Sequence, residues 1–215
     1  MTVFVNTFLL VYAALFPIVN PFGSAPIFLG LTSGYTNIER AQISRAIAIN
    51  SFFLLLGSLV IGSHVLEFFG VSVPIVRIAG GLVVTAFGWK LLNAAPLADQ
   101  SHAEQHADDA NPDTFYPLTM PLTVGPGSMS VAITLGSQRP PQTELQHFVV
   151  ASSGALSGLV AMALTVYLCY RFAPKLVSVL GRGGTNVVVR LSAFILLCIG
   201  IQILWNGMKD LVPLS

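Results

Sequence analysis

Two short segments combine proline, glycine and small polar residues inside stretches that are otherwise apolar. They are Asn20-Pro-Phe-Gly-Ser-Ala-Pro26 and Gly125-Pro-Gly-Ser128. Proline lacks an amide proton and clashes with the preceding helical turn, which costs about 3 kcal/mol in a helix interior. Glycine favours the unwound state by about 1 kcal/mol more. Neither segment is therefore expected to continue as an unbroken helix.

A broken helix exposes backbone groups that can bind ions. The amides at the start of the second half-helix favour an anion, and the carbonyls at the end of the first favour an ammonium group or a small cation. Two such breaks side by side would suit a small zwitterion. We predict a binding site from the residues nearest the breaks: Asn20, Pro21, Gly23, Ser24, Gly125, Gly127, Ser128 and Ser130. The alternative is that the breaks are kinks that shape the bundle and that their polar side chains satisfy loosened backbone.

The elements that position these segments are predicted to span a membrane. Apolar residues make up 54% of the 215-residue chain and charged residues only 9%, against about 25% in an ordinary globular protein. Uncharged apolar stretches of at least about 18 residues are typical of membrane-spanning helices. We predict an all-α polytopic membrane protein with six spans, at residues 3–31, 46–69, 71–93, 115–135, 148–172 and 187–212, and a polar loop at 95–113.

The two halves of the chain resemble each other. A shift of 104 residues places Pro17, Gly23, Ser24 and Leu31 on Pro121, Gly127, Ser128 and Leu135, and a shift of 113 places Arg77-Ile-Ala on Arg190-Leu-Ser. About nine extra residues in the second half are expected in the loop before the sixth span. Because each half holds three spans, the second copy enters the bilayer in the opposite sense. Residues 1–94 and 114–215 are thus predicted as inverted repeats, with broken helices 1 and 4, an architecture typical of secondary transporters.

Basic residues predict the orientation in the membrane. With the N-terminus outside, the inner loops carry seven basic residues and the outer loops three. Cytoplasmic loops are enriched in Lys and Arg. We therefore expect both termini on the outer side. The inner set is Arg40, Arg45, Lys90, Arg171, Lys175, Arg182 and Arg190, and the outer set is Arg77, Arg139 and Lys209.

Other polar residues in the spans are weaker candidates. Asn50 lies within the second span, where it could join two helices or line a cavity. Arg77 and Arg190 could serve a cavity or gate, because arginines inside a membrane are costly and often functional. They could also anchor the helices at the membrane surface, and packing is the favoured role for Gln202 and Asn206.

Several other function classes lack support in the sequence. The net charge of +1 provides no basic surface for nucleic acid. Cys169 and Cys198 lie in apolar spans, so no disulfide is expected. Ser157 is not accompanied by a deep histidine or lysine that could activate it, so no enzymatic activity is predicted. His102 and His106 in the polar loop do not form a known metal motif, and we predict no metal or cofactor.

The motifs at the breaks resemble those of the MarC family of bacterial inner-membrane proteins. The resemblance covers nearly the whole chain outside the polar loop. Membership implies six helices, an inner-membrane location and kinship with transporters of small neutral amino acids such as glycine and alanine. Many members have asparagine where this chain has Ser24. The resemblance is carried by residues 20–31, Arg77-Ile-Ala-Gly-Gly81, residues 121–127, Gly181-Arg-Gly-Gly184 and Arg190-Leu191.

These observations favour a secondary transporter of small neutral solutes, above all neutral amino acids, that works by alternating access about the paired breaks. Its partners are then the lipid bilayer and the solute, and a homo-oligomer is also compatible with the sequence. The alternative is a non-transporting membrane protein whose partner is another protein.

Overall fold

The computed structural model describes residues 2–93, 114–137 and 145–211, and these residues form helices joined by turns. The helices are α1 (Thr2–Val19), α2 (Pro21–Leu31), α3 (Asn37–Phe68), α4 (Val73–Leu92), η2 (Thr114–Thr123), α5 (Pro126–Ser137), α6 (Leu145–Arg171) and α7 (Ala173–Leu211). Five stretches in the described residues are long and apolar enough to cross a membrane, or six if η2 and α5, which meet at an angle of 69°, form one bent span. The prediction of an all-helical polytopic membrane protein is confirmed.

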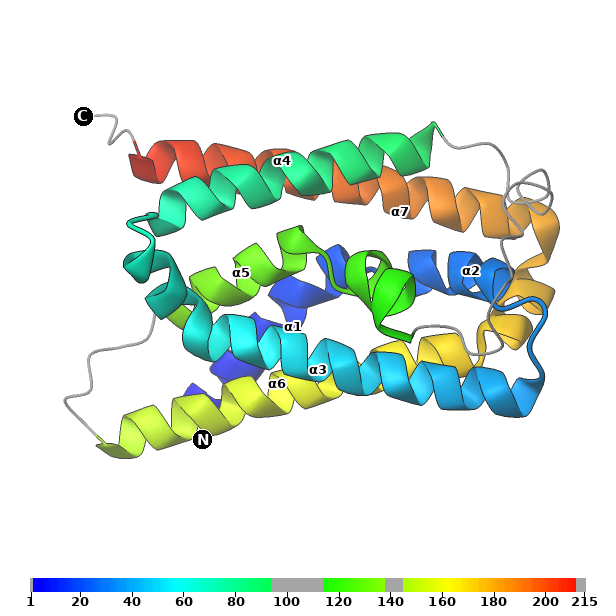
Figure 1. The fold of residues 1–215 in the computed structure, drawn as a ribbon, viewed down its shortest axis with the longest axis horizontal. Helices are drawn as coiled ribbons and strands as arrows, with labels where there is room; N and C mark the ends of the chain where they lie inside the picture. The colour runs from blue at the N-terminus through cyan, green and yellow to red at the C-terminus, as the bar shows by residue number, and fades with distance from the viewer. Residues whose placement is uncertain (1, 94–113, 138–144, 212–215) are drawn as a thin grey trace.

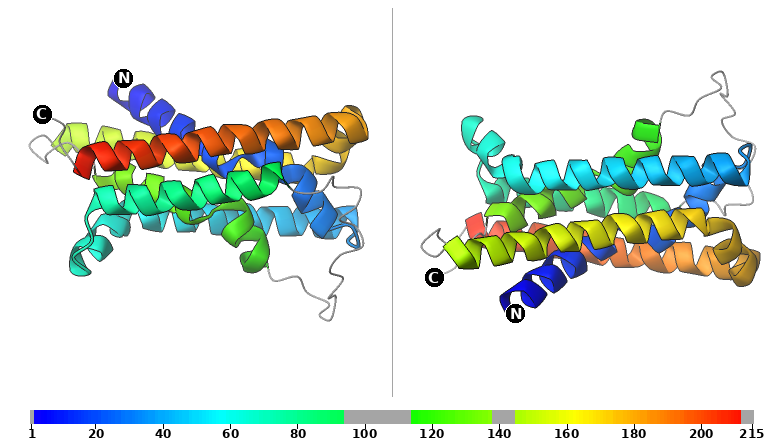
Figure 2. Two further views of the ribbon diagram at one scale, coloured as in Figure 1. Left: turned by 90° about the horizontal axis from the view of Figure 1, so that it is seen from above. Right: turned by 90° about the horizontal axis from the view of Figure 1, so that it is seen from below.

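The helices form three layers (Figures 1 and 2). The four segments on either side of the predicted breaks, α1, α2, η2 and α5, lie in the middle layer. The pair α4 and α7 covers one face of this layer, and the pair α3 and α6 covers the other. The broken segments are therefore covered by helices on two faces, in keeping with the need to bury irregular backbone at membrane depth.

Small residues let the helices of the outer layers approach closely. On the antiparallel pair α4 and α7, a Cβ atom added to Gly81 would lie 2.8 Å from the carbonyl oxygen of Gly200, and one added to Gly88 would lie 2.7 Å from the amide of Leu197. Gly154 and Gly158 of α6 likewise meet the backbone oxygens of Phe4 and Phe8 on α1. Close backbone approach of this kind is typical of helix packing in membranes.

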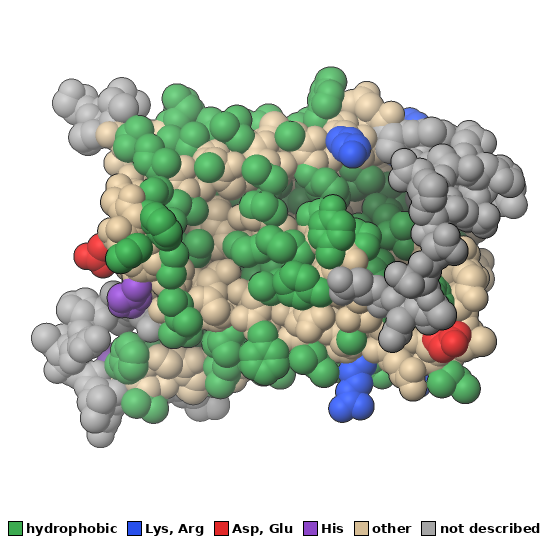
Figure 3. All heavy atoms as spheres, in the orientation of Figure 1, with side chains coloured by type: hydrophobic (Ala, Val, Ile, Leu, Met, Phe, Trp, Pro, Cys, Tyr) green, Lys and Arg blue, Asp and Glu red, His purple; other side chains and the backbone are tan. Residues whose placement is uncertain are grey.

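Large apolar side chains cover the outside of the bundle. The face shown in Figure 3 is hydrophobic across much of its middle, and its acidic side chains lie near the two ends. Leu9, Phe53, Leu82 and Phe194 are each more than half exposed. An apolar surface of this extent suits contact with lipid tails and not with water.

Two helices begin earlier than the sequence analysis predicted. α3 begins at Asn37, where Thr36 and Glu39 form a reciprocal cap, instead of near residue 46. α7 consists of a helix from Ala173 and a second helix that follows non-helical Gly181 (φ 66°, ψ 178°), and its apolar span, Gly183–Leu211, lies close to the predicted one. The residues before the sixth span, predicted as a loop, are therefore helical. The prediction followed the uncharged run, whereas a helix can continue into polar sequence once it leaves the hydrocarbon.

Candidate functional site

The first interruption is a single left-handed residue between α1 and α2. Asn20 has φ 48° and ψ 56°, and its side-chain oxygen accepts a hydrogen bond from the amide of Gly23 at 3.2 Å. In a continuous helix each carbonyl accepts from the amide four residues later. The carbonyl of Pro17 loses this donor because Pro21 has no amide proton, and that of Val19 loses it because the Gly23 amide bonds to Asn20. Pro21, Gly23 and Ser24 are all buried at this break, so its polar groups lie inside the protein.

The second interruption begins before the predicted Gly125-Pro-Gly-Ser128 segment. Within η2, Tyr116 and Met120 have extended backbone angles. The amide of Val124 donates to the carbonyl of Thr119 at 2.8 Å, a bond that spans five residues in place of the usual four. Regular helix resumes with the bond from the amide of Met129 to the carbonyl of Gly125 at 3.1 Å. The whole stretch from η2 to the start of α5 is therefore interrupted.

One buried tyrosine joins the two interruptions. The hydroxyl of Tyr170, on α6, lies 2.8 Å from the Thr123 hydroxyl at the end of η2. Ser24, in the first turn of α2, lies near the same hydroxyl. Its ring stacks on Phe28 of α2 with the ring centroids 4.4 Å apart. Because Tyr170 is fully buried, the bond to Thr123 forms in a medium where an unpaired hydroxyl would be costly.

The two breaks differ in how their free amides are satisfied. The Asn20 side chain caps α2, but the matching position before α5 is Val124, whose side chain cannot accept a hydrogen bond. Among the described residues, the amides of Gly127 and Ser128 have no hydrogen-bond acceptor. The Ser128 hydroxyl donates to the carbonyl of Gly125 at 2.9 Å. The start of α5 is thus the less satisfied of the two helix N-termini.

Ser130 adds a second unsatisfied group at the same place. Its side chain is only 2% exposed, and its hydroxyl has no hydrogen-bond partner among the described residues. It packs against Gly80 of α4, and a Cβ atom added to Gly80 would also lie 3.8 Å from the Cα atom of Gly127. Gly127 itself faces Val84, with no room for a side chain between them. Buried polar groups without partners mark this region as a candidate site.

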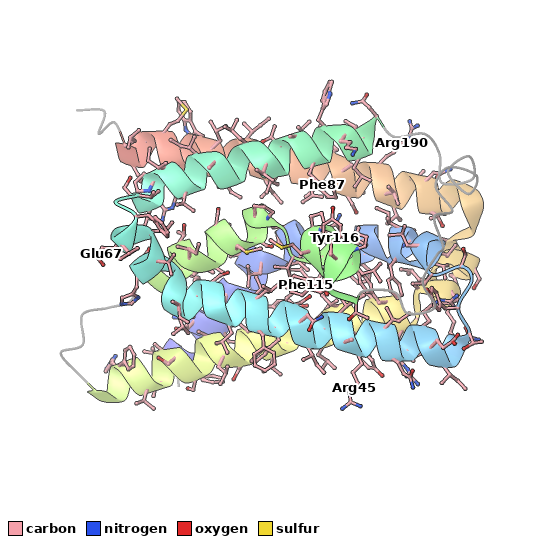
Figure 4. The ribbon with its side chains drawn as sticks, viewed as in Figure 1. Arg45, Glu67, Phe87, Phe115, Tyr116 and Arg190 are labelled. Atoms are coloured by element: carbon pink, nitrogen blue, oxygen red, sulfur yellow. The ribbon has the colours of Figure 1, made fainter. Side chains whose placement is uncertain are left out.

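The three predicted cavity or gating residues lie apart from one another. The amide of Asn50, on α3, reaches the Thr119 hydroxyl of η2 at 3.5 Å. Arg77, on α4, contacts Thr134 of α5 at 3.2 Å and forms an ion pair with Asp210. Arg190 is exposed and points away from the bundle in Figure 4. Arg77 and Arg190 therefore have different surroundings, although they align in sequence.

The remaining sequence candidates do not add to this site. Gln202 and Asn206 bond to each other at 2.9 Å on an exposed face of α7. No group of metal-ligating residues occurs in the ranges that the structure describes. His102 and His106 lie outside those ranges.

Comparison with known proteins identifies the family. Residues 5–212 match the MarC family of integral membrane proteins. This chain belongs to the MarC family. It is 31% identical over 206 residues to the membrane protein YvbG of Bacillus subtilis, covering 94% of each chain. It is 30% identical over 204 residues to the inner membrane protein MarC of Salmonella typhimurium, covering 92% of each chain. No solved structure matches it.

Membership in the MarC family confirms the resemblance seen in the motifs and an integral membrane location. The membrane protein YhcE of Escherichia coli is also 30% identical over 204 residues, covering 94% of this chain and 92% of its own. The match extends across both interrupted segments, so the site described above belongs to the part of the chain shared with these relatives.

Sequence reasoning missed two residues of this MarC-family protein that hold the interrupted segments. Tyr170 lies in an apolar span beside Arg171, and nothing local reveals that its side chain reaches two other helices. Arg40 entered the sequence analysis only as a charge. It is 8% exposed and donates to the carbonyls of Thr32 and Tyr35 at 2.8 and 3.0 Å, where it closes the end of α2. The position of Arg40, directly after the first interrupted segment and the turn that follows it, was the feature of the sequence that could have indicated this role.

Proposed function

We propose that this protein is a secondary transporter of small neutral solutes, above all neutral amino acids such as glycine and alanine. The observation that carries the proposal is the meeting of the two interruptions at Tyr170 in the middle layer. From there α2 and α5 run in opposite directions, so that both helix N-termini start near the middle of the bundle (Figure 1). Half-helix ends placed in this way are typical of transporter binding sites.

Two inverted three-helix repeats, residues 1–94 and 114–215, account for the packing. If α1 corresponds to η2, α2 to α5, α3 to α6 and α4 to α7, exchanging the halves converts most helix contacts into one another. The contact of α2 with α7 becomes that of α5 with α4, and α1 with α6 becomes η2 with α3. These matched contacts support six spans, with helices 1 and 4 broken.

The start of α1 and the end of α7 support an even number of spans. They lie at the same end of the bundle in Figure 1. The opposite end contains the α2–α3 turn and the α6–α7 junction, with Arg40, Arg45, Arg171 and Lys175. By the enrichment of basic residues in cytoplasmic loops, the termini face the periplasm and the basic end faces the cytoplasm.

The chemistry of the middle layer suits a solute without net charge. Its segments, residues 2–31 and 114–137, contain no Asp, Glu, Lys or Arg. The amides of Gly127 and Ser128 and the Ser130 hydroxyl would bind a carboxylate. The carbonyls of Pro17 and Val19, released by the first break, would accept hydrogen bonds from an ammonium group. A zwitterion supplies both charges and carries no net charge into the site.

Uptake into proteoliposomes tests this proposal. We expect the purified protein to take up labelled glycine and alanine with saturation, above the level in empty vesicles. Excess unlabelled alanine should suppress glycine uptake, whereas lysine and glutamate should not, because the middle layer has no charge to pair with theirs. Flux equal to that of empty vesicles for both solutes would contradict the proposal.

A matched pair of variants then assigns the site. Ser130→Ala removes the unpartnered hydroxyl and should raise the concentration of half-maximal uptake about tenfold, equivalent to about 1.4 kcal/mol. Ser44→Ala removes another buried hydroxyl, which bonds to the carbonyl of Arg40 away from the breaks. It should change that concentration less than about twofold, since 0.4 kcal/mol is about a factor of two. Equal effects of the two substitutions would remove Ser130 from the site.

A further inference from the structure

A basic hollow lies at the end of the bundle, away from both breaks. It has a volume of about 610 Å³ and lies between the first turns of α3 and the junction of α6 with α7. Both of its walls contribute cations. The residues that matter here are Arg40, Arg45, Tyr167, Arg171, Phe172 and Lys175.

The positive charge of this hollow is not neutralised by the described residues around it. No acidic side chain is among its lining residues. Glu39, in the neighbouring first turn of α3, accepts hydrogen bonds from the amide and hydroxyl of Thr36, both at 2.8 Å. The ion pair found among the described residues joins Arg77 of α4 to Asp210 of α7, and neither residue lines the hollow. Four cations that share one hollow repel each other, and an anion would relieve that repulsion.

The cations are held in place by neutral groups. Arg40 donates to Thr32, Tyr35 and Asn37, which fixes its guanidinium group. Arg171 donates to the Tyr167 hydroxyl at 3.0 Å, and its guanidinium lies 5.8 Å from the centre of that ring. Lys175 lies 5.7 Å from the centre of the Phe172 ring. Such contacts position the side chains and leave their charge unpaired.

An apolar groove continues from the basic hollow along α6. It has a volume of about 300 Å³ and shares Phe172 with the hollow. Its other lining residues include Phe22, Leu168 and Leu176. Leu168 precedes Phe172 by one helical turn, so the groove extends from the end of the bundle towards its middle. A phosphate group beside an acyl chain has the same arrangement of charge and apolar surface.

We propose that this hollow binds the phosphate head group of an anionic phospholipid, with one acyl chain of the same lipid in the adjoining groove. Basic hollows between membrane helices on the cytoplasmic side are suited to acidic head groups. Phe22 of the groove belongs to α2, but the test below measures lipid binding alone, so the proposal does not depend on the transport proposal. Inorganic phosphate presents the same anionic chemistry without the chain, and the experiment distinguishes the two.

Lipid titration of the delipidated protein in an uncharged detergent tests the site. Native mass spectrometry would count bound phosphatidylglycerol, with phosphatidylcholine and inorganic phosphate as separate arms. We expect phosphatidylglycerol to saturate one site and phosphatidylcholine to bind at least tenfold more weakly. Saturable binding of inorganic phosphate with the same affinity as phosphatidylglycerol would assign the hollow to a free anion and overturn the proposed lipid site.

Two pairs of substitutions separate this site from general charge attraction. Arg45→Gln with Lys175→Gln removes one exposed cation from each wall and should weaken phosphatidylglycerol binding at least tenfold. Lys90→Gln with Arg190→Gln removes the same charge from exposed positions outside the hollow and should change the affinity less than twofold. Equal loss in both double variants would overturn the proposal.

A substitution in the groove tests the acyl chain. Leu168 is 42% exposed, so Leu168→Trp can fill the groove without disturbing the core. It should weaken phosphatidylglycerol binding at least fivefold while the unfolding temperature without lipid stays within one or two degrees of the wild type. Unchanged lipid affinity in this variant would contradict binding of the chain.

Discussion

Gly127→Ala is expected to lower the free energy of unfolding by about 2 kcal/mol and glycine uptake at least tenfold. The added methyl group would overlap a methyl group of Val84 on α4, and overpacking a buried contact costs about 1–3 kcal/mol. The clash forces the start of α5 away from α4, which displaces the free amides proposed to bind the carboxylate. Unfolding by guanidinium in detergent and uptake into proteoliposomes measure the two effects.

A second substitution separates this clash from a general effect of alanine. Gly127→Ala with Val84→Ala removes the overlapping methyl groups and should recover at least half of the lost uptake. Gly30→Ala is the control, since a Cβ atom there would meet nothing within 4 Å. If the losses of uptake caused by the Gly127 and Val84 substitutions simply add in the double variant, the contact between these two residues does not position α5.

Tyr170→Phe is expected to lower the free energy of unfolding by about 1 kcal/mol and uptake at least fivefold. The change keeps the ring on Phe28 but removes the hydroxyl that bonds Thr123 and lies near Ser24. Thr123 keeps its own bond to the carbonyl of Leu118, so the loss is that of one hydrogen bond, about 0.5–1.5 kcal/mol. The two interrupted segments would also lose the hydroxyl contact that holds them in register.

Tyr167→Phe is the matched control for this substitution. Tyr167 lies three residues earlier on α6, and its hydroxyl accepts a hydrogen bond from Arg171 near the end of the bundle. Its removal should change stability by less than about 0.5 kcal/mol, as is usual for partly exposed positions, and should leave uptake unchanged. Equal losses in both variants would show that the Tyr170 hydroxyl has no special role between the breaks.

The sequence predicted the positions of the interruptions because their causes are local. Pro21 removes an amide proton, and Asn20 tolerates the left-handed backbone more readily than most residues. The second interruption extends further towards the N-terminus than predicted. Pro117 and Pro121 also lie within it, before the glycine-rich segment predicted as the break. Each of these prolines removes an amide proton, so the interruption starts earlier than the glycines alone indicate.

Contacts between distant segments could not be predicted in this way. Tyr170 bonds to Thr123 and stacks on Phe28, and no spacing rule connects these residues. The lack of partners at Ser130 depends on the glycine that faces it from α4. Arg77 and Arg190 occupy matching sequence positions, yet only Arg77 meets α5 and an acidic partner. Local sequence determines where a helix breaks, and packing determines which groups meet there.

The accessibility of a thiol at position 130 tests most directly whether the breaks form a transport site. Ser130→Cys would be made in a protein whose Cys169 and Cys198 are replaced by alanine, and reconstituted in vesicles. A membrane-impermeant thiol reagent is then added to either side, with or without glycine. We expect labelling from both sides, slowed at least threefold by glycine, and no labelling of Ser44→Cys. Absence of labelling from either side, or labelling that glycine leaves unchanged, would contradict the account.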